Sequence, residues 1–238
     1  MFISRMPLNT ARISAQQLIA SPYRMHAAVE GAFPPGSVRD GEDGRILWRL
    51  DSLDQNHGLW LYVVSPEAPD FTHLIEQAGW PTHMTWESKD YGPLLSRIAV
   101  GQCWNFRLKA NPVRLAWEDR GEHSHVSGDQ IVGKLQGHIT VHYQTEWLLK
   151  RCEKHGFTII PDDSGAPSVI VKQRHQERFG RGGKTVTLTT AVYEGRLQVT
   201  DADKFRHVLC HGLGRAKGFG CGLLTVAPIM RGNDADHA

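Results

Sequence analysis

The order of strand and helix patterns constrains the fold of this 238-residue chain more than any other feature of its sequence. Ser21-Pro22 predicts a helix start, with serine as the N-cap and proline in the first helical position. Two-residue alternation of apolar side chains predicts the strands. The elements expected in the first half are a strand at Phe2 to Met6, a helix from Ser21 to Gly31, strands at 46–50 and 59–64, a helix capped by Asp70 that runs to Ala78, and a strand at His83 to Trp86.

The second half of the chain repeats this order of elements without repeating the sequence. The elements expected there are a strand at Cys103 to Lys109, a polar loop at 118–130, a helix from His142 to Gly156, strands at 169–173 and 185–193, a helix capped by Asp201 that runs to Cys210, and a strand at Leu223 to Ile229. The order βαββαβ is typical of a unit whose two helices cover one face of an antiparallel sheet. We therefore predict an α+β fold of two tandem ferredoxin-like (RRM-like) domains, residues 1–95 and 96–238.

Charge is distributed unevenly, although the net charge is only +2. Residues 1–96 hold seven Lys and Arg against eleven acids, whereas residues 97–238 hold twenty against fourteen. A polyanion bound mainly by the second half would explain this asymmetry, and so would chance.

Composition indicates an ordinary globular protein, with 40% hydrophobic residues. No apolar run approaches the roughly twenty residues of a membrane helix, and the N-terminus does not resemble a signal peptide. We expect no membrane contact and a cytoplasmic location. The four cysteines form no C-x-x-C pair, so neither a zinc knuckle nor a disulfide framework is indicated.

Tyr23 and His26 are three residues apart near the start of the first expected helix, so their side chains share a face. Histidine titrates near neutrality and can move a proton at a ribose hydroxyl or a departing oxygen, and a tyrosine hydroxyl can assist. Both residues could instead simply pack in the core.

A glycine segment, Gly212 to Gly222, holds five glycines in eleven residues together with Arg215 and Lys217. Glycines let the backbone approach a ligand closely, and the two cations suit phosphates. The segment follows a helix and precedes a strand, which is the reverse of the order in a dinucleotide-binding fingerprint. Gly183-Lys184-Thr185 resembles the end of a Walker loop, but Arg178 stands where that loop needs its first glycine. The alternative is that these glycines only form tight turns and bind no ligand.

A basic segment at 172–184 joins two expected strands and holds five cations against one acid, Glu177. Such a hairpin can contact RNA phosphates, or it can be a solvated tip. Arg107, Lys109 and Arg114 are further possible phosphate contacts. His123 and His125 are the only close histidine pair and lack a third ligand at a recognisable spacing, so we predict no metal site and no cofactor.

Taken together, these residues resemble the CasE family, the endoribonucleases that process CRISPR RNA in type I-E Cascade complexes. The resemblance rests on Pro22-Tyr23-Arg24-Met25-His26, on residues 107–112, on the helix around Trp147, and on the glycine segment with its continuation to Pro228. That segment fits the family's pattern of Gly, a hydrophobic residue, Gly, five residues including a basic one, Gly, any residue and Gly.

The resemblance implies that the chain binds the repeat hairpin of precursor CRISPR RNA, cuts once at the 3′ base of the stem, and stays with the product and the other Cascade subunits. His26 and Tyr23 fall on the family's active-site helix. The expected chemistry is attack by a 2′-hydroxyl on the adjacent phosphate without a metal, with Lys184 as the cation that stabilises the transition state. The expected RNA-binding residues are Arg24, Lys109, Lys172, Arg174, Arg178, Arg181, Gly212, Gly214, Arg215, Lys217, Gly220 and Gly222.

Two other functions remain open at this point. The same fold and glycine segment would serve a non-catalytic RNA-binding subunit, or a small-molecule enzyme in which the glycine segment holds a nucleotide phosphate. Cleavage by a His26 variant distinguishes a nuclease from the non-catalytic RNA-binding subunit. The salt dependence of binding distinguishes an RNA-binding protein from the small-molecule enzyme, because RNA binding weakens more steeply with salt.

Overall fold

The structure, a computed structural model, describes residues 1–53, 58–80, 85–116 and 134–229. Its N-terminal unit is an antiparallel sheet with strand order β2-β3-β1-β4. The elements of this unit are β1 (Phe2–Leu8), α1 (Ile13–Ile19), α2 (Pro22–Glu30), β2 (Leu47–Leu53), β3 (Gly58–Ser65), α3 (Thr72–Ala78) and β4 (Glu87–Asp90).

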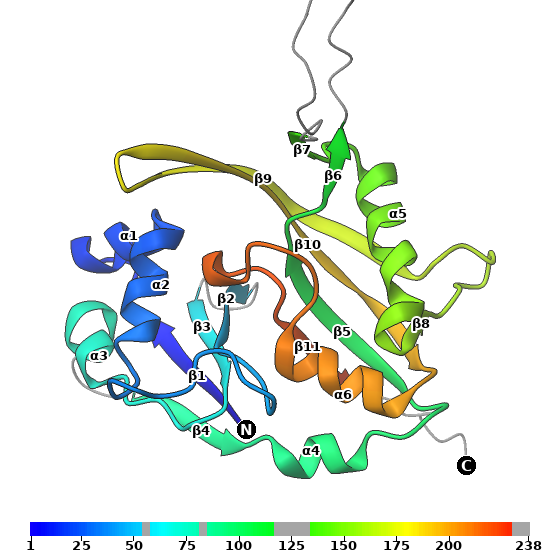
Figure 1. The fold of residues 1–238 in the computed structure, drawn as a ribbon, viewed down its shortest axis with the longest axis horizontal. Helices are drawn as coiled ribbons and strands as arrows, with labels where there is room; N and C mark the ends of the chain where they lie inside the picture. The colour runs from blue at the N-terminus through cyan, green and yellow to red at the C-terminus, as the bar shows by residue number, and fades with distance from the viewer. Residues whose placement is uncertain (54–57, 81–84, 117–133, 230–238) are drawn as a thin grey trace, which may run out of the picture.

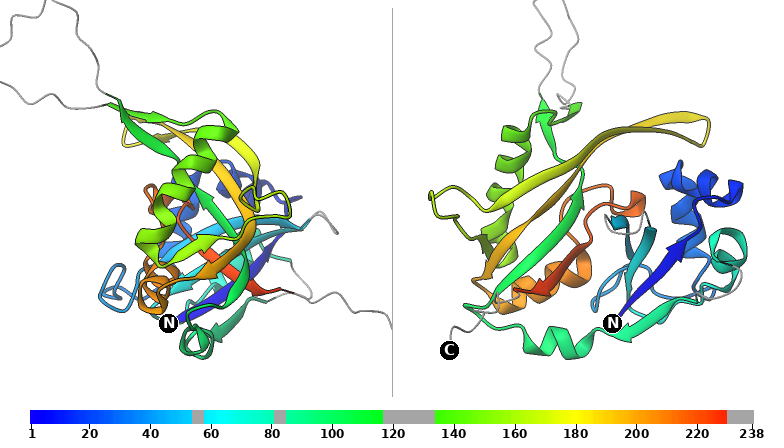
Figure 2. Two further views of the ribbon diagram at one scale, coloured as in Figure 1. Left: turned by 90° about the vertical axis from the view of Figure 1, so that its right-hand side faces the viewer. Right: turned by 180° about the vertical axis from the view of Figure 1, so that it is seen from behind.

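The C-terminal unit has the corresponding strand order, β11-β5-β10-β8, with β9 also paired to β10. Helix α4 (Gly92–Arg97) leads into it from β4, along one edge of the molecule (Figure 2). Its elements are β5 (Cys103–Ala110), β6 (Val113–Ala116), β7 (Lys134–Gly137), α5 (Val141–Cys152), a 3-10 turn η1 (Glu153–His155), β8 (Phe157–Ile159), β9 (Val169–Arg181), β10 (Lys184–Val199), α6 (Ala202–His211), a 3-10 turn η2 (Lys217–Phe219) and β11 (Leu224–Pro228). The α+β fold of two tandem ferredoxin-like units is therefore confirmed (Figure 1).

Several local predictions need correction. The last strand of the first unit is Glu87–Asp90 rather than His83 to Trp86, of which residues 81–84 lie outside the described residues. Helices α1 and α4 were not expected, and the boundary proposed at 95/96 falls within α4, so that boundary stays a prediction. The expected loop at 118–130, with His123 and His125, also lies outside the described residues.

The basic segment at 172–184 belongs to a hairpin whose strands are much longer than the two predicted at 169–173 and 185–193. Residues 169–181 and 184–199 are continuous strands, and only Gly182 and Gly183, both at positive φ, form the turn. β9 and β10 together make a long hairpin that extends well beyond the second sheet (Figure 1). The basic residues therefore lie along its two arms.

Each unit has an apolar core, and the second core also includes residues of the first sheet. Met25 and Val29 of α2 are fully buried in the first core, against Met6 and Leu61. In the other core, Leu47 and Val64 join the buried side chains that α5 and α6 cover. Burial of this kind stabilises by about 25 cal/mol per Å² of apolar surface, so the shared core holds the two units against each other.

Arg49 joins the two units through hydrogen bonds. The side chain is 1% exposed and makes two 2.7 Å bonds to the carboxylate of Asp51. It also donates to the main-chain oxygens of Arg107 and Leu223 and to Oγ1 of Thr225, each at 2.8 Å. Because Arg107 is on β5, Leu223 precedes β11 and Thr225 is on β11, this guanidinium fixes β2 to the second sheet.

Candidate active site

Helix α2 presents Tyr23 and His26 as the sequence predicted. Ser21 caps the helix by accepting a hydrogen bond from the main-chain N–H of Arg24 at 3.3 Å, and Pro22 occupies its first turn. Because Met25 faces the core, His26 is turned toward the second unit, with its side chain 35% exposed. Tyr23 is 42% exposed and Arg24 is also exposed.

The glycine segment forms the surface that faces His26. A Cβ added to Gly218 would stand 3.5 Å from the imidazole ring, and the ring of Phe219 meets the imidazole edge-on with centroids 6.4 Å apart. Phe219 in turn packs against Phe179 of β9, with the two ring centroids 5.0 Å apart. Three elements distant in sequence, α2, η2 and β9, therefore meet at this histidine.

The surroundings of the His26 side chain favour its neutral form. Burial lowers its pKa below the ordinary value, the charge of Glu30 opposes that effect, and the cations Arg181 and Arg45 lower the pKa further. Nδ1 is buried and has no hydrogen-bond partner among the described residues, and Oε1 of Glu30 is 4.0 Å from it. A neutral imidazole can accept a proton at neutral pH, which is what a general base requires.

The loop glycines pack against the protein itself. Gly212, Gly214, Gly220 and Gly222 all have positive φ, and Gly212, Gly220 and Gly222 are buried. A Cβ on Gly220 would lie 2.6 Å from the ring of Trp48. These glycines therefore give the loop its shape, and direct RNA contact by them stays a prediction.

Two cations lie near His26. Lys217, next to Gly218, is half-buried, and burial followed by the charge of Arg45 lowers its pKa. The guanidinium of Arg181 lies over the ring of Phe219, 5.6 Å from its centroid. Lys184, expected as the phosphate-stabilising cation, is exposed. In the register of the hairpin it lies opposite Arg181, across the turn. Of these two hairpin cations, Arg181 is the one whose charge acts on the pKa of His26.

The other basic residues fall into two groups. Lys109 makes a 2.8 Å ion pair with Glu177, and Lys172 makes a 2.9 Å ion pair with Glu194. These pairs cross between strands and leave the two lysines less available for phosphates. Exposed side chains that remain available are those of Arg174, Arg178, Arg181 and Arg215.

Sequence reasoning missed Glu30, Arg45 and Phe219 as parts of this site. Glu30 is four residues after His26 on one helix, a spacing that could have identified it. Phe219 lies inside the glycine segment, where an aromatic residue among glycines was a usable signal. Nothing near Arg45 in the sequence links it to His26.

Comparison with known proteins identifies the family of this chain. The family model described as "CRISPR associated protein" matches residues 1–228. The chain belongs to this family of CRISPR-associated proteins.

Among its relatives, the CRISPR-associated endoribonuclease Cse3 of Thermus thermophilus is 30% identical over 235 residues, covering 96% of this chain and all of the relative. The CRISPR system Cascade subunit CasE of Escherichia coli is 26% identical over 199 residues, covering 76% of this chain and 94% of the relative. The resemblance to the CasE family is therefore confirmed.

Solved structures of the same family superpose over most of the chain. A structure of CRISPR endoribonuclease Cse3 bound to a 19-nucleotide RNA has a TM-score of 0.76 at 27% identity and covers 96% of this chain and all of that one. Thermus thermophilus Cse3 bound to an RNA that represents a pre-cleavage complex has a TM-score of 0.74 at 26% identity, covering 95% and 98%.

Proposed function

We propose that the chain is an endoribonuclease that binds the repeat hairpin of precursor CRISPR RNA and cuts it at the 3′ base of the stem. One observation carries this proposal: His26 has a lowered pKa and an unpartnered Nδ1, and it lies where α2, the glycine segment and the basic hairpin meet. The RNA-bound Cse3 structures support it, because they superpose over almost the whole chain.

In the proposed reaction, His26 takes the proton of a ribose 2′-hydroxyl, and the resulting oxygen attacks the adjacent phosphate. The bond to the 5′-oxygen of the next nucleotide breaks, and that oxygen leaves as a hydroxyl after taking up a proton from the imidazolium of His26 or from Tyr23. The products are a 2′,3′-cyclic phosphate and a 5′-hydroxyl. Tyr23, one turn away on the same helix face, orients the phosphate or shares the proton transfer.

The developing negative charge needs a cation nearby. Our candidates for this role are Arg181 and Lys217, because their neighbours Phe219 and Gly218 lie beside His26. Lys184 retains the role as a competing assignment, because it lies next to Arg181 across the hairpin turn. Arg24, Arg174 and Arg178 then hold phosphates of the stem, which is recognised chiefly by its shape and backbone.

We further propose that the protein keeps its product and carries it into a Cascade complex, since the Escherichia coli relative is named as a Cascade subunit. No helix of the described residues is long and apolar enough to cross a bilayer. The cytoplasm, where precursor RNA is made, is the location that we predict.

Incubation of the purified protein with an end-labelled repeat hairpin in excess chelator tests the proposal. We expect one cut at the 3′ base of the stem, with a cyclic phosphate on the upstream fragment. Cleavage abolished by chelator and restored by a divalent ion would contradict the metal-independent chemistry. Tight binding of the intact hairpin without any cleavage would instead identify a non-catalytic RNA-binding subunit.

A further inference from the structure

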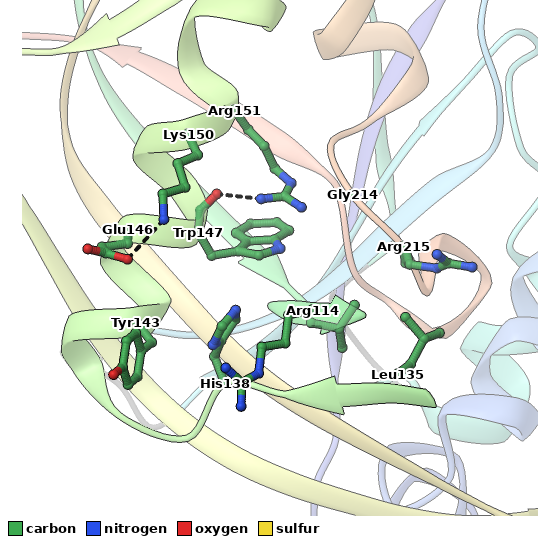
Figure 3. Close-up of a pocket in the computed structure, with 11 residues that line it drawn as sticks. Arg114, Leu135, His138, Tyr143, Glu146, Trp147, Lys150, Arg151, Gly214 and Arg215 are labelled. Carbon is green, nitrogen blue, oxygen red and sulfur yellow. Dashed lines mark hydrogen bonds and ion pairs between the residues drawn. The ribbon is translucent and has the colours of Figure 1, made fainter. Parts of the chain in front are cut away.

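A second site lies on the other side of the glycine segment from His26. It is a pocket of about 550 Å³ between α5, the β6–β7 hairpin and the segment, within the range of nucleotide-sized ligands. Figure 3 shows cationic and aromatic side chains around it. Those that carry the argument are Arg114, His138, Tyr143, Trp147, Arg151 and Arg215.

The pocket has more positive than negative charge. Its one acid, Glu146, is already paired with Lys150 at 3.1 Å and with His142 at 3.5 Å. Arg215 is exposed and makes no hydrogen bond or ion pair with any residue that the structure describes. Within the described part of the chain, the hydrogen bond of Arg114 is a long one, 3.4 Å to Gln136. Two guanidinium groups are therefore available to a phosphate.

Flat side chains complement these charges. The imidazole of His138 stacks on Tyr143, with centroids 5.8 Å apart, and Tyr143 is 51% exposed. The guanidinium of Arg151 lies 4.2 Å from the centroid of the Trp147 ring. Unpaired bases stack on exposed aromatic rings and on arginine planes of this kind.

Trp147 supplies an independent sign of a ligand. The side chain is 3% exposed and lines the pocket, yet its Nε1 has no hydrogen-bond partner in the structure. Indole nitrogen only donates, and burial of a donor without an acceptor destabilises the folded protein. A ligand oxygen in the pocket would satisfy it.

The glycine segment connects this pocket to His26. Gly214 and Arg215 line the pocket, while Gly218 and Phe219 face the imidazole. Arg215 and Gly218 are three residues apart, so their Cα atoms are separated by at most about 11 Å. An RNA strand that crosses the loop from His26 therefore reaches the pocket within a few nucleotides.

We propose that this pocket is a subsite for one unpaired nucleotide that flanks the stem, with its base beside Tyr143 and its phosphate on Arg215 and Arg114. The inference rests on the proposed function and deepens it, because it assigns recognition of the flanking single strand to residues separate from those that perform the cut. An acidic segment of a partner protein is the competing occupant.

The test compares two RNAs, the repeat hairpin with its single-stranded flanks and the stem-loop alone, in binding to the wild-type chain and to the Arg215→Gln and Arg114→Gln variants. Arg97→Gln, at an exposed arginine of α4, is the matched control. We expect each pocket variant to bind the flanked RNA about tenfold more weakly than the wild type does, and its affinity for the stem-loop alone to fall by a much smaller factor.

Equal weakening for both RNAs would overturn the subsite, because the arginines would then be general phosphate contacts. No weakening for either RNA would also overturn it and would leave an acidic protein segment as the occupant. Both results are distinguishable from failure of the proposed function, in which the wild-type chain itself neither binds nor cuts the flanked hairpin.

Discussion

Nδ1 of His26 lies 4.0 Å from Oε1 of Glu30, one helical turn further along α2, and has no hydrogen-bond partner in the part of the chain that the structure describes. The other carboxylate oxygen of Glu30 accepts a 2.8 Å bond from Arg39, which holds the side chain in place. A carboxylate in this position favours the protonated imidazole, and closure of the gap on RNA binding would orient the ring.

Removal of the Glu30 charge should therefore change the pH dependence of cleavage. In Glu30→Gln the favourable charge is lost while burial, Arg181 and Arg45 still lower the His26 pKa. If His26 is the base, the acidic limb of the rate profile moves to lower pH, because the histidine stays neutral further into acid. Single-turnover rates across pH measure this, with Glu76→Gln on α3 as the control. An unchanged or higher midpoint would contradict the account.

Arg181 and Lys184 face each other across the hairpin turn and make a matched pair for identifying the stabilising cation. Arg181 lies over Phe219 and acts on His26, so Arg181→Gln should slow the chemical step about 10²-fold. Lys184→Gln should slow it far less. Rates at saturating enzyme decide between them, and the opposite ranking would restore the assignment to Lys184.

Gly220 is a position where both the backbone and the neighbouring side chain require glycine. Its φ is +75°, and a Cβ would lie 2.6 Å from Trp48. Gly220→Ala should destabilise the protein by about 2–5 kcal/mol through left-handed strain and overpacking, and should weaken RNA cleavage with it. Gly183→Ala, at similar φ with nothing within 4 Å, should cost only about 1–2 kcal/mol. Urea unfolding measures the free energy of unfolding of both variants. Equal decreases in the two variants would contradict the claim that contact with Trp48 adds to the cost at Gly220.

Arg49 should be the most important ion-paired residue for the association of the two units. Arg49→Ala leaves the nearly buried Asp51 without its main partner and should cost about 3–5 kcal/mol of unfolding free energy. The control is Arg5→Ala, which breaks an exposed pair with Glu87 and should lower the unfolding free energy far less. Similar costs for the two variants would show that the buried network does not fix the interface.

Much of the fold could be predicted from the sequence because its signals are local. Ser21 and Asp201 act as N-caps where expected, and Gly156 ends the 3-10 turn after α5 with φ +75°. Strand β4 was misplaced because its four residues are all exposed and carry no apolar alternation. The basic segment is predicted as a hairpin between two short strands, and the strands are longer than predicted because the mostly exposed side chains of β9 show little apolar alternation.

The candidate site was predicted only in part, for a physical reason. Tyr23 and His26 share one helix, so their proximity follows from helix geometry. Arg181, Arg45 and Phe219 reach His26 from three other parts of the chain, and tertiary packing alone brings them together. The sequence also could not reveal that Lys109 and Lys172 are held in ion pairs with Glu177 and Glu194, which belong to other strands.

Single-turnover cleavage of the repeat hairpin by wild type and by His26→Ala, in chelator and at saturating protein, tests the central claim most directly. Loss of a general base or acid should slow the cut by about 10²- to 10⁴-fold while the affinity for the hairpin is kept. Cleavage by His26→Ala at the wild-type rate, with unchanged binding, would contradict the assignment of the chemistry to this histidine.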